Sequence, residues 1–137
     1  MISRRAGRFR AQQLSAVIAL LFGLATLGAG GGVLAGRDPG YVVYQPLLMF
    51  NTLMGVGYMA AGFLAWRHVR SGRNASALIF ALNLLVLGGV SYRYRTGSDV
   101  AIDSVRAMIF RTVVWLALAS VLAWASREAA GSGDRRR

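Results

Sequence analysis

Three strongly polar side chains stand inside long apolar runs of this sequence: Asn51, Asn83 and Arg111. An arginine in the middle of a membrane helix costs about 2.5–3.5 kcal/mol on insertion scales, so its presence indicates a functional candidate. A guanidinium and two amides can together hold an anion or a polar substrate by hydrogen bonds. Trp115 follows Arg111 by one helical turn, and we expect its ring to face the guanidinium. These four residues form a candidate intramembrane polar site.

The positions of these residues along the apolar runs predict that they meet. Asn51, Asn83 and Arg111 each lie about seven or eight residues from the end of a run that we assign to the outer side of the membrane. At 1.5 Å per residue this depth is roughly 10–13 Å, so we expect one shared polar layer in the outer half. No carboxylate lies at that depth, because Asp103 is two turns nearer the surface. The expected partners of Arg111 are asparagine amides, backbone carbonyls, water or a ligand anion.

A structural role is the alternative for the same residues. The two asparagines would then bond across helices, and Arg111 would extend its stem toward the lipid headgroups. Thr26, Thr52 and Thr112 lie in the same runs and can support either role. The sequence leaves both interpretations open.

The elements that must position these side chains are four apolar runs, each about as long as a bilayer is thick. They cover residues 12–35, 44–66, 75–90 and 107–125 of a chain of 137 residues, of which 55% are hydrophobic and 15% charged. Segments of roughly 17–24 residues cross a hydrocarbon core of about 30 Å. We therefore predict an all-α membrane protein, a single integral membrane domain with four transmembrane helices in an up-down-up-down bundle. The first run exceeds the apolar part of a signal peptide, so we expect it to stay as an uncleaved helix.

The connections between the runs are short. Residues 38–40, Asp-Pro-Gly, are typical of a turn. Residues 71–74 predict a tight turn in which Asn74 caps the third helix. Residues 92–98 are expected to be irregular, after which Asp99 or Ser98 caps a short amphipathic stretch. Asp99 and Asp103 are expected to cap this approach to the fourth helix and to balance Arg106.

Arginine placement predicts the orientation. All sixteen basic residues are arginine, which hints at a GC-rich bacterial genome. Eleven arginines flank the side shared by both termini and the second connection, four flank the other side, and Arg111 lies within a run. Since cytoplasmic loops carry the excess of basic residues, we expect a bacterial inner-membrane protein with cytoplasmic N- and C-termini. The larger group comprises Arg4, Arg5, Arg8, Arg10, Arg67, Arg70, Arg73, Arg127, Arg135, Arg136 and Arg137, and the smaller group Arg37, Arg93, Arg95 and Arg106.

Small residues in the first run predict close helix packing. Gly28, Gly32 and Gly36 recur every four residues and would line one face of a helix. Such rows let backbones approach where lipid gives helices no hydrophobic incentive to associate. The row fits packing within the bundle or a face between two copies of the chain. Gly23 lies off the row, so we expect a bulky residue there to matter less than one at Gly32.

Composition argues against several chemistries. The chain has no cysteine, which excludes disulfides, thiol redox pairs and thiolate metal sites. Its one histidine, His68, is expected at a cytoplasmic helix end, whereas a four-helix cytochrome needs several helix histidines. Small multidrug transporters carry a carboxylate in the first span, and none is present here. Small fluoride channels have a similar size but a polar and phenylalanine pattern that we do not find. We expect no cofactor, no metal and no nucleic-acid partner, and we assign the chain to no family.

These observations favour a non-enzymatic accessory, assembly or scaffold subunit whose partners are the lipid bilayer and either further copies of itself or a larger membrane complex. The alternative is a small oligomeric transporter or channel component that uses the intramembrane polar site. An intramembrane enzyme ranks third, because only Asp99 and Asp103 offer acid or base groups near the spans. The sequence names no substrate, ion or partner protein.

Overall fold

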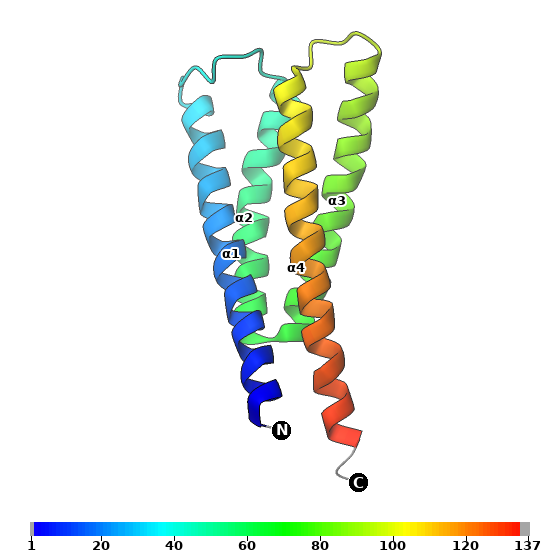
Figure 1. The fold of residues 1–137 in the computed structure, drawn as a ribbon. Helices are drawn as coiled ribbons and strands as arrows, with labels where there is room; N and C mark the ends of the chain where they lie inside the picture. Colours follow the sequence, from blue (N-terminus) through cyan, green and yellow to red (C-terminus); the bar gives the residue numbers. More distant parts are fainter. Residues whose placement is uncertain (1, 135–137) are drawn as a thin grey trace.

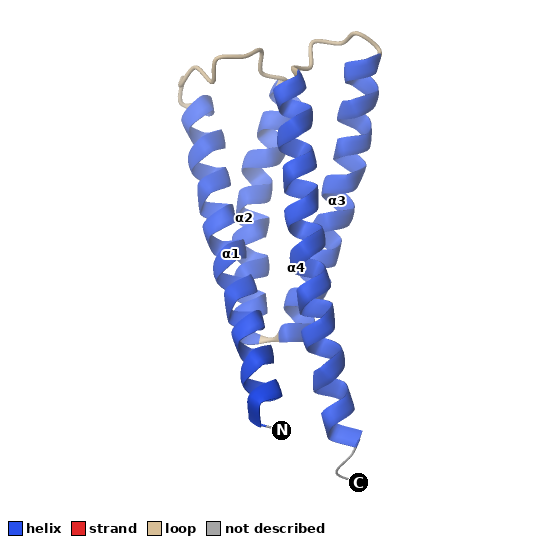
Figure 2. Ribbon diagram, viewed as in Figure 1, coloured by secondary structure: helices blue, strands red, loops and turns tan. Residues whose placement is uncertain are grey.

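The computed structural model describes the backbone of residues 2–134 and the side chains of residues 6–127. Arg135, Arg136 and Arg137, and the side chains of Arg4 and Arg5, lie outside this description. The elements are α1 (Ile2–Leu34), α2 (Gln45–Arg67), α3 (Val69–Arg95) and α4 (Ile102–Asp134). Between residues 2 and 134 the chain forms helices, turns and loops and contains no strand (Figure 2).

All four helices are long and apolar enough to cross a membrane, which confirms the prediction of four such helices. The candidate spans are Ala6–Leu34, Gln45–Arg67, Val69–Arg95 and Ile102–Arg127. The third is the most different from its predicted length, since it has 27 residues and reaches roughly 40 Å. It is longer because the polar residues at both of its ends continue the helix beyond its apolar centre.

The helices lie side by side (Figure 1). The α1–α2 and α3–α4 loops lie at one end, and both termini and the α2–α3 link lie at the other. α1 packs along α2 and α3 along α4, with less extensive contacts between α2 and α3 and between α1 and α4. The arrangement is thus two helical hairpins joined along a looser seam.

The connection between the hairpins is shorter than predicted. Residues 71–74 are helical, and His68 alone separates α2 from α3 with φ −142° and ψ 112°. The tight turn expected there is therefore wrong, and so is the cap by Asn74, whose side-chain oxygen accepts hydrogen bonds from Arg73. Gly72 explains why the helix can begin early. It lies against Ala65, where an added Cβ would collide with the Cα of that residue.

At the loop end of the bundle, the ends of α1 and α3 also differ from those predicted from the sequence. α3 continues through Tyr92 and Tyr94 to Arg95, so only residues 96–101 are irregular. α1 ends at Leu34, and Gly36 follows in the left-handed conformation with φ 99°. Its backbone N–H bonds to the carbonyl of Val33, which satisfies part of the helix C-terminus. Gly36 therefore ends the helix rather than extending a row along it.

Close approach of α1 and α2 depends on glycines outside the predicted row. A Cβ on Gly62 would lie 3.0 Å from the Ala16 carbonyl oxygen. A Cβ on Gly23 would lie 2.8 Å from the Gly55 carbonyl oxygen, and one on Gly55 would lie 2.8 Å from Cγ of Leu27. These glycines let the two backbones touch where any side chain would hold them apart.

The prediction that Gly28, Gly32 and Gly36 pack the bundle is wrong. No atom lies within 4 Å of a Cβ built on Gly28 or Gly36, and the nearest atoms to one on Gly32 belong to the side chain of Arg37 in the following loop. The expectation that Gly23 matters less than Gly32 is reversed for the same reason. The spacing of four residues was correct for a helix face, but that face does not meet another helix of this chain. A role between copies of the chain stays a prediction.

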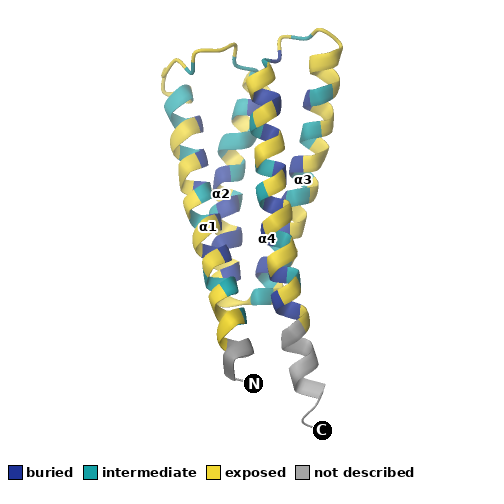
Figure 3. Ribbon diagram, viewed as in Figure 1, coloured by how far each residue is buried: buried dark blue, intermediate teal, exposed yellow. Residues whose placement is uncertain are grey.

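Buried residues occur along the length of the helices (Figure 3), and their apolar side chains form three clusters. The loop-end cluster contains Leu47, Val90, Val100, Val105 and Met108. The central cluster contains Ala19, Tyr58, Ala61, Ile79, Trp115 and Leu118. The terminal cluster contains Ala16, Ala65 and Leu122. The polar residues identified from the sequence fall between the loop-end and central clusters along α2, α3 and α4.

Candidate functional site

A hydrogen bond between α2 and α3 forms the centre of the candidate site. The hydroxyl of Tyr58 donates to Oδ1 of Asn83 across 3.1 Å, and both side chains are fully buried. Tyr58 stands in the middle of an apolar helix, where its hydroxyl requires a partner to offset desolvation. Asn83 supplies that partner from the neighbouring hairpin. The bond therefore joins the two hairpins at the level of the central cluster.

Trp115 of α4 packs against the same tyrosine. The two ring centroids are 4.8 Å apart, and Phe22 of α1 packs against Tyr58 at 5.6 Å. Tyr58 thus touches residues from all three other helices. The prediction that the Trp115 ring faces Arg111 is wrong. Within residues 6–127 the arginines placed over aromatic rings are Arg67 on Phe63 and Arg93 on Tyr44.

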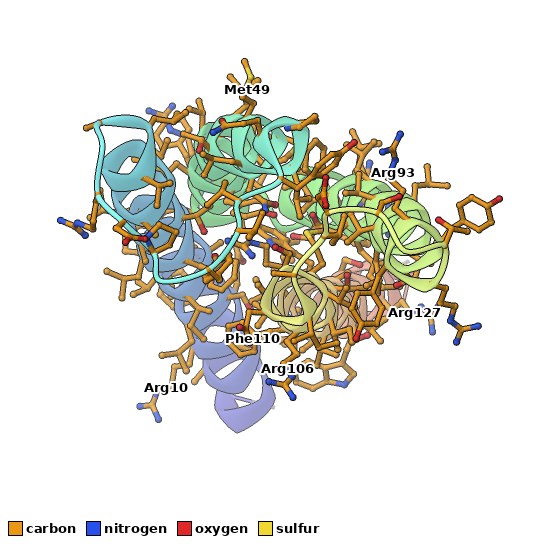
Figure 4. All side chains as sticks on the ribbon, turned by 90° about the horizontal axis from the view of Figure 1, so that it is seen from above. Arg10, Met49, Arg93, Arg106, Phe110 and Arg127 are labelled. Atoms are coloured by element: carbon orange, nitrogen blue, oxygen red, sulfur yellow. The ribbon has the colours of Figure 1, made fainter. Side chains whose placement is uncertain are left out.

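Arg111 lies one turn from Trp115, toward the loops. Its side chain is half-buried, and its Nε atom is buried without a hydrogen-bond partner among the described residues. The labelled side chains of Arg10, Arg93, Arg106 and Arg127 point away from the bundle (Figure 4), whereas Nε of Arg111 is buried. Arg111 therefore brings positive charge into the interior seam.

Four polar atoms of the site are buried and have no hydrogen-bond partner among the described residues. They are Oδ1 of Asn51, Nδ2 of Asn83, Nε of Arg111 and Nε1 of Trp115. One is an acceptor and three are N–H donors. Buried polar groups in proteins are almost always paired, so such a concentration needs an explanation. An excess of donors around one tyrosine favours a ligand that accepts hydrogen bonds.

The polar residues of the site lie at different depths and form a column along the bundle, rather than the single layer predicted. Asn83 lies twelve residues from the end of α3, and Tyr58 and Trp115 each lie thirteen from the loop ends of α2 and α4. Asn51 and Arg111 lie only six and nine residues from those ends. At 1.5 Å per residue, Asn83 is roughly 5–10 Å deeper than these two. The difference arises because α3 continues to Arg95, beyond the predicted end of its apolar run.

The other predicted polar residues do not join the column. The hydroxyls of Thr52 and Thr112 donate to carbonyls four residues earlier in their own helices. Asp103 pairs with Arg106 at 3.4 Å on the exposed loop end, which confirms the expected balance between these two residues. Their hydrogen bonds are satisfied locally, so they offer nothing to a ligand in the seam.

Tyr58 is the member of the site that sequence reasoning missed. Tyrosine in an apolar run is usually counted as core or as an interfacial anchor. The available signal was its position at the centre of a span, far from either interface, where a hydroxyl must find a partner. Asn83, on the helix that follows, was the nearest suitable acceptor.

Residues 6–127 contain no group of three histidine, cysteine, aspartate or glutamate side chains that could hold a metal ion. Comparison of the chain with protein-family models, curated proteins and solved structures gives no match. The site is therefore interpreted from its own geometry.

Proposed function

We propose that this chain is a bacterial inner-membrane protein that crosses the bilayer four times as an up-down-up-down bundle, with both termini in the cytoplasm. The lengths and apolar surfaces of the four helices support insertion. The termini and the α2–α3 link share one end (Figure 1), and the larger group of arginines belongs to that end. The excess of basic residues supports a cytoplasmic location for it.

Side chains at the ends of the helices support the same placement. Arg67 lies 4.9 Å from the ring of Phe63 at the end of α2, and Arg93 lies 5.4 Å from Tyr44 at the opposite end of the bundle. Trp66 and Trp124 are half-exposed near the cytoplasmic ends of their helices. Aromatic and basic side chains gather at both interfaces of membrane proteins, so these contacts fit helix ends at headgroup level.

Within the membrane, the chain acts as a non-enzymatic accessory, assembly or scaffold subunit. The observation that carries this proposal is that most of its surface consists of apolar helix faces, with only short connections between the helices. Large apolar side chains cover the outer faces of the helices, among them Leu53 and Leu85, while residues 35–44, 68 and 96–101 are all that lies between helices. Such a chain offers partners its helix faces and little else. Lateral association in the bilayer is thus the function that its surface favours.

The test is whether the native protein, taken from its own membrane, is part of a larger complex. We expect a tagged chain, expressed from its own locus and extracted in a mild detergent, to migrate with one larger complex at fixed stoichiometry. Deleting the chain should lower the abundance of that complex, and restoring it should recover it. Migration as a free monomer, with no membrane complex changed by the deletion, would contradict the proposal.

A second candidate is a transporter or channel component, favoured by the four unpaired polar atoms in the seam. This function requires a continuous path or an alternating opening, so it predicts solute flux when the purified chain is reconstituted in liposomes. Homo-oligomerisation together with flux would favour transport. Association with a larger complex without flux favours the accessory function.

A further inference from the structure

We propose that Tyr58, Asn83, Arg111 and Trp115 form a binding site for one small monovalent anion, of the size of chloride or formate, that is reached from the loop half of the bundle and holds the anion without conducting it. This inference goes beyond an accessory role, because it gives the chain a ligand of its own.

The charge of Arg111 is the first argument. The sequence contains five acidic residues: Asp38 and Asp99 in loops, Asp103 in the first turn of α4, and Glu128 and Asp134 near the C-terminus. Asp38 accepts the backbone N–H of Gly40, and Asp103 pairs with Arg106. Among residues 6–127 the one salt bridge joins Arg106 to Asp103, so no carboxylate of these residues pairs with Arg111. A half-buried guanidinium without a counter-charge is costly, and an anion removes that cost.

The hydrogen-bond donors are the second argument. Asn83 and Trp115 are both 0% exposed, and Nδ2 of Asn83 and Nε1 of Trp115 have no acceptor among the described residues. Nε of Arg111, one turn away, is a third such donor. Tyr58 contacts Asn83 and Trp115 directly, which places their side chains around one ring. Three N–H donors, one of which belongs to a charged guanidinium, match an anion better than a neutral ligand.

The surrounding side chains limit the size and the path of the ligand. The rings of Phe22 and Trp115 pack against Tyr58 at 5.6 and 4.8 Å, so these aromatic side chains exclude a large ligand. Toward the termini the interior is mainly apolar and continues as Ala61, Ile79 and Leu118, then Ala65 and Leu122. The buried polar side chains in that half are the neutral hydroxyls of Ser15, Ser76 and Ser126. Toward the loops, by contrast, Arg111 lies one turn above Trp115 and is only half-buried, so its guanidinium marks the side from which an anion would enter.

The test uses the fluorescence of Trp115 to report anion binding. The chain has three tryptophans, so Trp66→Phe and Trp124→Phe leave Trp115 as the sole fluorophore. The full-length protein in lipid nanodiscs is titrated with sodium chloride and with sodium formate, and sodium gluconate keeps the ionic strength constant. We expect a saturable change in Trp115 emission with either small anion. A linear dependence on concentration, or no change, would overturn the proposal and leave water as the sufficient partner of the donors.

Two matched arginine variants show whether the change in Trp115 emission comes from anion binding at the proposed site. Arg111→Leu should weaken apparent anion affinity by about tenfold or more, because it removes a charge-assisted hydrogen bond. Arg106→Leu, five residues away on the same helix, should leave the titration unchanged, since Arg106 is exposed at the loop end. Equal titrations for both variants would show only general binding at the protein surface. Asn83→Leu gives an independent measurement and should also weaken the response.

Two further measurements separate this inference from the proposed function. Liposomes containing the protein should show no chloride efflux above that of empty liposomes, and efflux that depends on Arg111 would contradict retention of the ion. Anion binding and migration with the larger complex are both measured on the wild-type protein. If the wild type binds no anion but migrates with the complex, the anion site is wrong and the accessory function stands. If the wild type binds an anion but migrates without a complex, the accessory function is wrong instead.

Discussion

The hydroxyl of Tyr58 donates a hydrogen bond to the side-chain oxygen of Asn83 across 3.1 Å, linking the two helical hairpins inside an apolar core. The hairpins contact each other less extensively than the helices within each hairpin do. A polar link at this looser seam fixes which faces of α2 and α3 meet, because a rotation of either helix would leave both groups unpaired. The same bond orients the Asn83 amide nitrogen, one of the donors of the proposed anion site.

Tyr58→Phe should destabilise the protein by about 0.6–2 kcal/mol, because it removes the donor and leaves the Asn83 oxygen without a partner. Asn83→Leu should cost a similar amount by leaving the tyrosine hydroxyl unpaired. The double variant should cost less than the sum of the two single variants. Reversible unfolding in mixed micelles measures all three, and strictly additive effects would show that the bond contributes nothing to stability.

In a buffer without small anions, Arg111→Leu should leave the fold intact and raise the free energy of unfolding by about 1–3 kcal/mol, because it removes an uncompensated charge from an apolar helix. Arg111→Lys should keep the charge but bind the anion poorly, since lysine lacks the planar fork of donors. Thermal unfolding together with the Trp115 titration measures both effects. A destabilised Arg111→Leu protein would indicate that the residue is structural, with stability and anion binding falling together.

Gly62→Ala should destabilise the α1–α2 hairpin by about 1–3 kcal/mol, because the new methyl group would lie 3.0 Å from the Ala16 carbonyl oxygen. Gly28→Ala is the matched control. Its methyl group meets no atom within 4 Å, so alanine should be neutral or stabilise by about 0.5–1 kcal/mol through helix propensity. Unfolding in detergent compares the two. The opposite order of stability would restore the row containing Gly28 as the packing face.

Fusion reporters test the proposed orientation. Alkaline phosphatase should be inactive when fused after Arg137 or inserted at His68, the residue that separates α2 from α3. It should be active when inserted after Gly97 in the α3–α4 loop. Green fluorescent protein should show the converse pattern. Active phosphatase at His68, or mixed activity at every position, would contradict four crossings with one fixed orientation.

Gly36→Ala should destabilise α1 at its C-terminus by about 1–2 kcal/mol, because residue 36 has φ 99° and alanine adopts this conformation at a cost. Gly36→Asn should cost less, since asparagine tolerates the left-handed region. Hydrogen exchange of the α1–α2 loop measures the local effect. Equal exchange in both variants would show that the loop, rather than the cap, sets the end of the helix.

The sequence by itself determined the number of long apolar helices and the identity of most polar residues in the seam. Both follow from local properties. Hydropathy depends on consecutive side chains, and an arginine or asparagine in such a run is visible without knowledge of its neighbours. Helix ends were less well predicted, since residues 71–74 and 92–95 have turn-like composition yet continue α3.

The tertiary structure alone decided which residues meet. Periodicity placed Gly28, Gly32 and Gly36 on one helix face, but it could not show that this face lies away from α2 while Gly23 packs against Gly55. In the same way, Arg111 and Trp115 share a face of α4, yet the Trp115 ring packs against Tyr58 of α2. The rotation of each helix about its own axis is fixed by contacts between segments distant in sequence. For this reason the pairing of Tyr58 with Asn83, and the excess of donors around it, appear only in the folded bundle.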